Sequence, residues 1–140
     1  TAQWEARHHV YWALVNMHPG HVYIITDTAV PLARLPESIA YAQQQLAAMG
    51  LQGSILGHVG DGNFHTLVAV PPEEADRARA FAGQLVHHAL ALGGTASGEH
   101  GIGLVKRRYM AEEHGDALEW MRRLKALFDP EGLLNPGKII

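Results

Sequence analysis

The sequence contains no cysteine among its 140 residues. This absence excludes a disulfide framework, catalysis by a thiolate and any zinc site built on sulfur ligands, and it leaves the redox compartment open. Long apolar runs are missing as well, since no segment approaches the roughly 20 residues that span a bilayer. The N-terminus also lacks the basic and then apolar layout of a secretory signal peptide. The sequence therefore predicts neither a disulfide-stabilised scaffold nor a membrane-spanning protein.

Neither sign of charge dominates the composition. There are 11 basic and 14 acidic residues, giving a formal charge of −3 at pH 7, without long blocks of one sign. A nucleic-acid partner is therefore not expected. With 47% hydrophobic and 18% charged residues, the composition is typical of globular proteins, and a chain of this length can bury roughly two-thirds of its unfolded surface. We expect one domain over residues 1–140.

Histidine and glycine, in contrast, are abundant, with 10 and 15 copies. They gather in Gly57–His65 and Gly98–Gly103, where a purely structural chain has little reason to place them. The chain also begins at Thr1, in helix-like sequence and without an initiator methionine, which suggests a piece of a longer protein.

Hydrophobic periodicity predicts an α+β fold. The pattern indicates helices over 2–17, 36–49, 75–92 and 112–128, and strands over 22–30, 54–60, 63–70 and 95–97. The central order βαββαβ is that of a ferredoxin-like antiparallel sheet with two helices on one face, here flanked by N- and C-terminal helices. The apolar tail over 133–140 is too short to be a domain, so we expect it to dock on another surface.

A hairpin is predicted between the second and third strands. Asp61-Gly62 is a dipeptide typical of the two-residue type I′ turn, in which both residues need positive φ. That turn would pair Gly60 with Asn63 and set His58 directly opposite His65. Both imidazoles would then share one open face of the sheet. Alternation places the apolar side chains of the hairpin on the other face, which helices should cover: Ile55, Val59, Phe64, Val68 and Val70.

Two imidazoles on one face can converge on a metal ion, because cross-strand Cβ atoms lie about 4.5–5.5 Å apart. Glu99 is the candidate third ligand, provided that the loop after the last strand folds back across the sheet. Two histidines and a carboxylate leave coordination positions open for substrate and suit zinc, iron(II) or manganese. His100 could be a fourth ligand, but adjacent residues point apart, so a catalytic base is the preferred interpretation. The alternative is that these histidines are ordinary surface or core residues.

Three long segments resemble a known family in the right order. They are GHVGDGNFH at 57–65, GEHGIG at 98–103 followed by Lys106-Arg107, and DPEGLLNPGK at 129–138. They are similar to the C-terminal, substrate-side domain of FAD-linked oxidases, a family that includes cytochrome-type D-lactate dehydrogenase, glycolate oxidase and D-2-hydroxyglutarate dehydrogenase. WEARH at 4–8 and DTAVP at 27–31 also match, so the resemblance runs end to end and is strongest to the D-lactate dehydrogenase branch.

The resemblance implies a chemistry for the histidine cluster. His58, His65 and Glu99 would hold a divalent metal, zinc or manganese, which binds the carboxylate and hydroxyl of a small D-2-hydroxy acid of the D-lactate or glycolate type. His100 would remove the hydroxyl proton while a hydride goes to the flavin. Arg7 would pair with the substrate carboxylate, because the guanidinium fork matches a planar carboxylate.

The FAD itself would be held mainly by an N-terminal domain that this chain lacks. The glycine-rich segment 57–62 is not followed by the helix that a phosphate-binding loop requires. Asn135, in the tail, is the candidate flavin contact within this chain. We therefore expect the fragment alone to be inactive, with an N-terminal FAD-binding domain as its partner and with self-association through the apolar tail as a further expectation. The expected location is the cytoplasm, or the periphery of a membrane through an electron-accepting partner.

Two other classes of function compete with this interpretation. One is a stand-alone ferredoxin-like regulatory module that binds a metal or small molecule without catalysis. The other is an iron(II) oxygenase or metallohydrolase that uses the same two-histidine, one-carboxylate set. The tail motif over 129–138 argues against the isolated module, which has no use for it.

Overall fold

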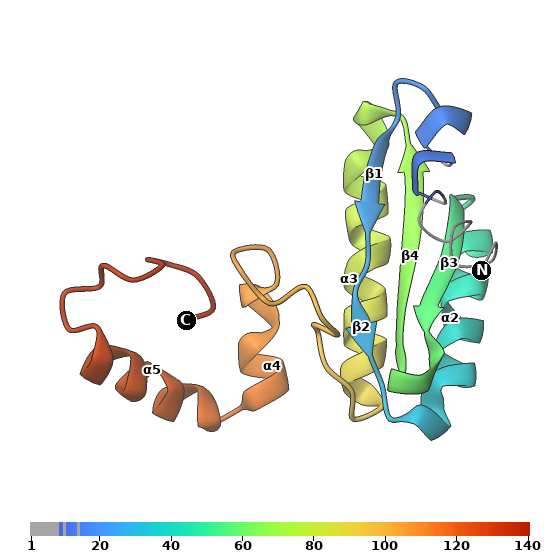
Figure 1. Cartoon of the computed structure of the whole chain (residues 1–140). Coiled ribbons are helices and arrows are strands. Elements are labelled where there is room, and N and C mark those ends of the chain that lie inside the picture. Colours follow the sequence, from blue (N-terminus) through green and yellow to red (C-terminus); the bar gives the residue numbers. More distant parts are fainter. Residues whose placement is uncertain (1–8, 10, 14) are drawn as a thin grey trace.

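The computed structural model describes residues 9, 11–13 and 15–140, and Figure 1 shows their arrangement. The described residues of 9–17 are helical. The predicted N-terminal helix over 2–17 therefore falls partly outside the described residues. Met17 and His18 line a small pocket with Tyr23 and Leu67, so the end of this segment lies against the open face of the sheet.

Two long helices follow the predicted ranges. Helix α2 spans Leu35–Ala48 and has a proline in its first turn, where the missing N–H costs nothing. Helix α3 spans Ala75–Ala91 and follows the 3₁₀ turn Pro72–Glu74. Gly50 and Gly93, with φ of 59° and 77°, turn the chain away after them. Both helix predictions are confirmed to within two residues.

The sheet is built around the long strand β4, Asn63–Val70. On one side it pairs with β3, Gln52–His58, and on the other with β1, Val22–Ile25, and then β2, Thr28–Ala29. All of these pairings are antiparallel, so the α+β class is confirmed. The single strand predicted over 22–30 is wrong in one respect, because it is interrupted at Thr26 and Asp27.

The last predicted strand, over 95–97, is also wrong, because it is reduced to one antiparallel bridge between Ala29 and Thr95. Gly94 allows the close approach of the two segments, since a Cβ there would lie 2.2 Å from the Ala29 carbonyl oxygen. Beyond Thr95 the chain turns out of the sheet, and Ser97 donates a side-chain hydrogen bond to Asp27 instead. The strand order alone does not show the ferredoxin-like arrangement.

The core lies between the sheet and both long helices, which cover the same face (Figure 1). Phe64 and Val68 of β4 are buried against Phe81 and Leu85 of α3, as the alternation predicts. Burying each such side chain contributes about 1.5–3 kcal/mol. Val59 is an exception: it is 63% exposed because it lies in a turn rather than in a strand.

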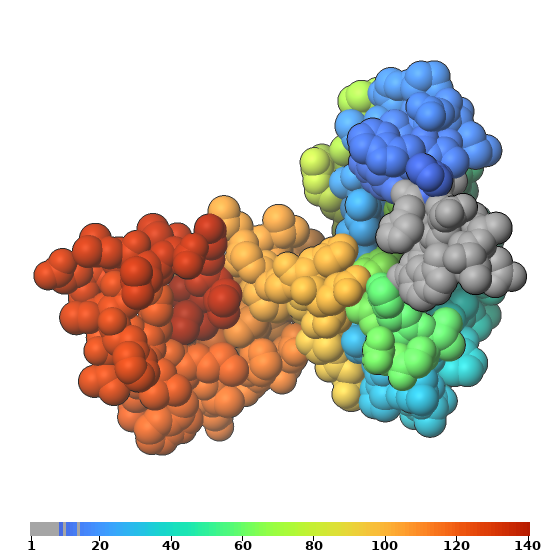
Figure 2. All heavy atoms as spheres, viewed as in Figure 1, coloured from blue at the N-terminus to red at the C-terminus, as the bar shows by residue number. Residues whose placement is uncertain are grey.

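The C-terminal residues form a lobe beside this body, which we define as residues 101–140 (Figure 2). The helix predicted over 112–128 is split into α4, Met110–His114, and α5, Ala117–Phe128. Gly115, with φ of 49°, breaks it. A small second core around Val86, Ala96 and Tyr109 joins lobe and body. Among the described residues, no helix combines the length and apolarity needed to cross a membrane.

Candidate functional site

His58 and His65 share the open face of the hairpin, but their predicted register is wrong. The loop has four residues, because Val59–Asp61 form a 3₁₀ turn and only Gly62 has positive φ, at 70°. The Val30 N–H donates to the Gly62 carbonyl, which fixes this longer loop. His58 therefore faces Asn63, while His65 faces Leu56.

A shift of two residues preserves the faces of both strands. The two imidazoles are diagonal neighbours, with ring centroids 5.9 Å apart and planes at 90°. The expectation that they meet on one face is confirmed, although they are not directly opposite each other.

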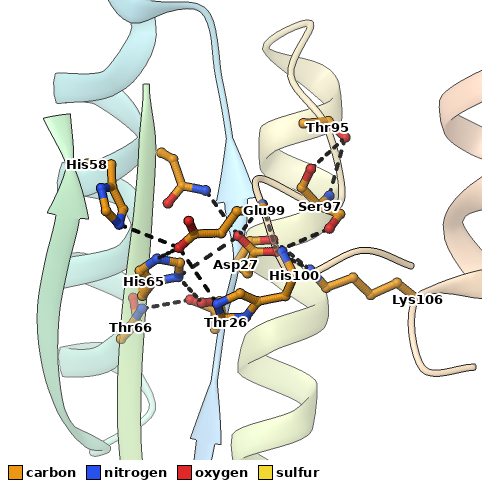
Figure 3. Close-up of polar contacts among 11 residues, drawn as sticks. Thr26, Asp27, His58, His65, Thr66, Thr95, Ser97, Glu99, His100 and Lys106 are labelled. Carbon is orange, nitrogen blue, oxygen red and sulfur yellow. Dashed lines mark hydrogen bonds and ion pairs between the residues drawn. The ribbon is translucent and has the colours of Figure 1, made fainter. Parts of the chain in front are cut away.

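Thr26 fixes the tautomer of His65. The Nδ1–H group of His65 donates to the Thr26 carbonyl oxygen at 3.0 Å. A neutral imidazole carries one N–H, so its Nε2 then presents a lone pair. That nitrogen points at Glu99, as Figure 3 shows. The ring is therefore oriented as in many metal-ligating histidines, which donate their other N–H to a carbonyl or carboxylate.

Glu99 reaches the two histidines because the loop after Thr95 folds back across the sheet, as the sequence interpretation required. Its Oε1 lies 2.8 Å from His65 Nε2 and 3.5 Å from His58 Nε2. One ligand atom from each of the three residues lies within 4.8 Å of the others. The structure thus brings together the three residues predicted as ligands.

A divalent cation fits this donor set. Two ligands bound tetrahedrally at about 2.1 Å from a metal lie about 3.4 Å apart, close to the separation of His58 and Glu99. His65 Nε2 and Glu99 Oε1 are both acceptors when His65 is neutral with its proton on Nδ1. Two acceptors at 2.8 Å repel each other unless a proton or a cation lies between them. The three residues could therefore hold zinc, manganese or iron(II).

His100 lies beside the same cluster. Its ring stacks on that of His65, with centroids 5.0 Å apart and planes 7° apart. Its Nε2 is 3.7 Å from Glu99 Oε1, and its side chain is 53% exposed. The ring can therefore meet a small molecule bound at the cluster.

Asp27 is the residue of this site that the sequence interpretation missed. Its side chain is almost fully buried, and it accepts hydrogen bonds from Asn63 Nδ2, Ser97 Oγ and the backbone N–H groups of Glu99 and His100. In the sequence it is one carboxylate inside a β-branched run and the first residue of DTAVP, one of the segments that resemble the family.

Lys106 supplies the countercharge to Asp27. Its Nζ lies 2.8 Å from Asp27 Oδ2 and also donates to the Asp27 carbonyl oxygen. Burial would raise the pKa of the Asp27 carboxyl, but hydrogen bonds from Lys106, the His100 N–H and Asn63 outweigh it and hold that pKa well below its usual range. Asp27 is therefore an ionised acceptor at neutral pH.

Asp27, His65 and His100 form a second group whose ligand atoms lie within 4.8 Å of one another. Both oxygens of Asp27 already accept hydrogen bonds from several protein donors. The first group, with Glu99, is therefore the better cation site.

Two further site residues were predicted, and the structure describes one of them, Asn135, which is not part of this cluster. Arg7 lies outside the described residues. Asn135 lies in the exposed tail with φ of 48°, and its Oδ1 accepts a hydrogen bond from Lys138 Nζ at 3.0 Å. The tail returns to the start of the lobe, where the Ile139 N–H donates to the Gly103 carbonyl.

A family model and several known proteins match almost the whole of this chain. The chain matches the family "FAD linked oxidases, C-terminal domain" over residues 1–139. It is 45% identical over 141 residues to a protein of Danio rerio named probable D-lactate dehydrogenase, mitochondrial, covering 98% of this chain and 28% of the relative. It is 42% identical to D-lactate dehydrogenase [cytochrome], mitochondrial, of Arabidopsis thaliana, with coverage of 98% and 25%.

A third relative is the GlcD subunit of glycolate oxidase from Escherichia coli strain K12, which is 38% identical over 144 residues, with coverage of 98% and 28%. The chain thus spans about a quarter of the length of these relatives. The match over almost every residue shows that the chain belongs to the family of C-terminal domains of FAD-linked oxidases.

Proposed function

We propose that this domain binds a small D-2-hydroxy acid at a divalent metal ion, as part of an FAD-dependent enzyme that oxidises the acid to the 2-oxo acid. The observation that carries the proposal is the convergence of His58, His65 and Glu99, with His65 oriented by the Thr26 carbonyl. The names of the relatives, which refer to D-lactate and glycolate, support the substrate class.

His58 Nε2, His65 Nε2 and a Glu99 oxygen would hold zinc or manganese. Bound there, such an ion supplies a Lewis acid that makes a coordinated hydroxyl more acidic. The single carboxylate among the three ligands neutralises part of the ionic charge. Three protein ligands would leave coordination positions open for the carboxylate and hydroxyl of a substrate.

His100 acts as the general base in this proposal. Its Nε2 lies beside Glu99 Oε1, next to the space that the three ligands surround, and its ring is half exposed. Nε2 is therefore placed to accept the hydroxyl proton of a substrate bound at the cluster. Glu99 cannot take that proton while it neutralises the metal.

We propose further that Arg7 pairs with the substrate carboxylate and that Asn135 contacts the flavin. The glycine-rich turn after β3 leads directly into the strand β4 and not into the helix that a phosphate-binding loop requires. FAD would therefore be held mainly by an N-terminal domain. We also propose a ferredoxin-like order for the sheet, in which Thr95 marks the position of the fourth strand.

The exposed apolar side chains of the lobe support a flavin domain as the partner. Leu127 and Phe128 at the end of α5 and Leu133 and Leu134 in the tail are all more than 60% exposed. Apolar surface gathered in this way usually marks an interface. The relatives are several times longer than this chain, so they contain the additional sequence that could cover it. The expected cytoplasmic location stays a prediction. The relatives from Danio rerio and Arabidopsis thaliana are named as mitochondrial.

Titration of the chain with Zn²⁺ and Mn²⁺, followed by calorimetry and elemental analysis, tests the metal site. The wild-type chain should bind one ion, and His58→Ala with His65→Ala should abolish that binding. His87→Ala is the matched control, because His87 also pairs with a glutamate, Glu112, at 2.8 Å on the exposed side of α3. Equal affinity in the wild type and the double variant would refute the site.

A further inference from the structure

The break between β1 and β2 has an unusual hydrogen-bond pattern. The Thr26 N–H donates to the Thr66 carbonyl at 3.0 Å, as in a regular antiparallel pair. In such a pair, the Thr66 N–H would donate to the Thr26 carbonyl in return. Instead it donates to the Thr26 side-chain oxygen, Oγ1, at 2.8 Å. The hydroxyl thereby releases the Thr26 carbonyl, which accepts the hydrogen bond from His65 Nδ1.

The next residue, Asp27, binds the opposite half of the site. Its carboxylate accepts the N–H of Glu99 at 3.0 Å and the N–H of His100 at 2.9 Å. These are charge-assisted hydrogen bonds, which are roughly twice as strong as neutral ones. They fix the backbone from which the Glu99 and His100 side chains project (Figure 3).

The loop that carries Glu99 and His100 is also packed tightly against Asp27. At Gly98 an added Cβ would lie 1.5 Å from Asn63 Nδ2 and 2.7 Å from Asp27 Oδ1. The loop backbone therefore sits directly on the Asp27 and Asn63 side chains. Ser97 and Lys106 donate to the same carboxylate from either side of Gly98.

We infer that Thr26 and Asp27 are positioning residues for this site, with Thr26 orienting His65 and Asp27 orienting Glu99 and His100. Two consecutive residues at one strand break thus arrange side chains that lie more than 30 positions apart in the sequence. The inference about geometry stands on the contacts alone, whereas its consequence for metal affinity rests on the proposed function.

Thr26→Val tests the first half, because it keeps the shape of the side chain and removes the hydroxyl. Without the hydroxyl, we expect the Thr66 N–H to turn to the Thr26 carbonyl, as in a regular antiparallel pair, so that His65 Nδ1 shares this acceptor and is held less firmly. We expect ¹⁵N NMR to show His65 losing its Nδ1–H tautomer. Thr26→Ser, which keeps the hydroxyl, should retain the Nδ1–H tautomer of His65. Thr66→Val is the matched control, because the Thr66 hydroxyl is buried without a hydrogen-bond partner among the described residues.

Asp27→Asn tests the second half. We expect the backbone N–H groups of Glu99 and His100 to lose protection from hydrogen exchange. The side-chain carboxamide of this variant has one acceptor oxygen, so it cannot accept from all the donors that converge on the carboxylate. Asp129→Asn is the matched control. Asp129 is also buried and also accepts two consecutive backbone N–H groups, those of Leu133 and Leu134, together with a lysine, Lys125.

Titration of the same variants with Co²⁺, a probe for zinc sites, measures the consequence for the cluster. Loss of partners behind the ligands typically costs 10–100-fold in metal affinity, and we expect a fall in that range for Asp27→Asn and for Thr26→Val. Thr26→Ser, Thr66→Val and Asp129→Asn should bind as the wild type does. Asp27→Asn with Lys106→Met removes the unpaired lysine, so it should recover stability without recovering affinity.

The outcomes separate the two proposals. If the wild type binds no Co²⁺, the proposed metal site is wrong, while the tautomer and exchange measurements still decide the positioning roles. If the wild type binds and loses the metal in the double histidine variant, but Asp27→Asn and Thr26→Val bind equally well with unchanged amides and tautomer, the positioning roles are overturned. If the double variant of Asp27 and Lys106 regains full affinity, Asp27 acts only as a countercharge.

Discussion

The sheet body and the C-terminal lobe differ in how far their large apolar side chains are buried. In the body, Phe64 and Phe81 are no more than 1% exposed, enclosed by two helices and a sheet. In the lobe, Trp120 and Phe128 of α5 are 65% and 78% exposed. The body therefore has a core of its own, whereas the apolar face of α5 has its larger side chains in solvent.

Polar contacts partly replace packing in the lobe. Asp129 joins the end of α5 to the tail by accepting the N–H groups of Leu133 and Leu134 and pairing with Lys125. Asp27 makes an equivalent set of contacts in the body, but next to the histidine cluster. In both regions, a carboxylate that pairs with a lysine accepts two consecutive backbone N–H groups. In the body it holds the loop that carries Glu99 and His100, and in the lobe it holds the start of the tail.

The largest expected effect concerns the chemistry of the body. In the enzyme with its flavin domain, His100→Ala should lower the rate of flavin reduction by roughly 10²–10⁴, the range for losing a positioned base. Metal content should be preserved, as measured by elemental analysis beside stopped-flow absorbance. His114→Ala, a histidine of the lobe, is the control.

Two results would contradict the role of His100. Loss of the metal in His100→Ala would make this residue a ligand, and full activity would mean that another group takes the proton.

Matched phenylalanines test the difference in packing directly. Phe81→Ala should destabilise the isolated chain by about 3–5 kcal/mol, the usual cost of removing a core phenylalanine. Phe128→Ala should change stability by less than about 0.5 kcal/mol, as for exposed positions. Urea denaturation followed by circular dichroism measures both. A large loss of stability in Phe128→Ala would mean that the lobe is packed within the chain itself.

The docking of the lobe should show a smaller effect. Leu127→Glu places a charge on the exposed apolar face, so it should weaken association with a separately produced flavin domain by roughly tenfold or more, as expected for a residue at the centre of an interface. The same change should reduce self-association of the isolated chain, measured by sedimentation. Arg122→Gln, which lowers the net charge by one as Leu127→Glu does, is the control for charge alone. Unchanged association in Leu127→Glu would place the interface elsewhere.

Sequence patterns predicted the parts of the fold that short-range chemistry determines. The periodicity of apolar residues defined α2 and α3, and strict alternation placed Phe64 and Val68 in the core. Alternation also put His58 and His65 on one face, and this survived a register error because the shift was an even number of residues.

The parts that depend on distant partners could not be predicted. Asp61-Gly62 favours a two-residue turn locally, but the Val30 N–H binds Gly62 and stabilises a longer loop. The strand break arises because the hydroxyl of Thr26 replaces its carbonyl as the acceptor for the Thr66 N–H. The residues next to Thr26 in the sequence do not indicate this exchange of acceptors. The role of Asp27 depends on donors about 70 residues away.

The smallest expected effect is a pH dependence that distinguishes the two aspartates. A hydrogen bond from Lys125 outweighs the effect of burial and, with the N–H groups of Leu134 and Leu133, lowers the pKa of Asp129. Since the folded-state pKa lies below the value of about 3.9 in an unfolded chain, the ionised form stabilises the fold above that value. This contribution is lost as the pH falls through the folded-state pKa.

Asp129→Asn should therefore reduce stability at pH 7 and flatten the fall in stability that the wild type shows as the pH drops below about 5. Asp27→Asn should act in the same direction but more strongly, because the pKa of Asp27 is lowered further and its carboxylate is bound by more donors. Thermal unfolding at a series of pH values measures both slopes, with the exposed loop residue Asp61, as Asp61→Asn, for comparison. If both aspartate variants kept the wild-type slope, the acid sensitivity of the fold would have to come from carboxylates outside these two contacts.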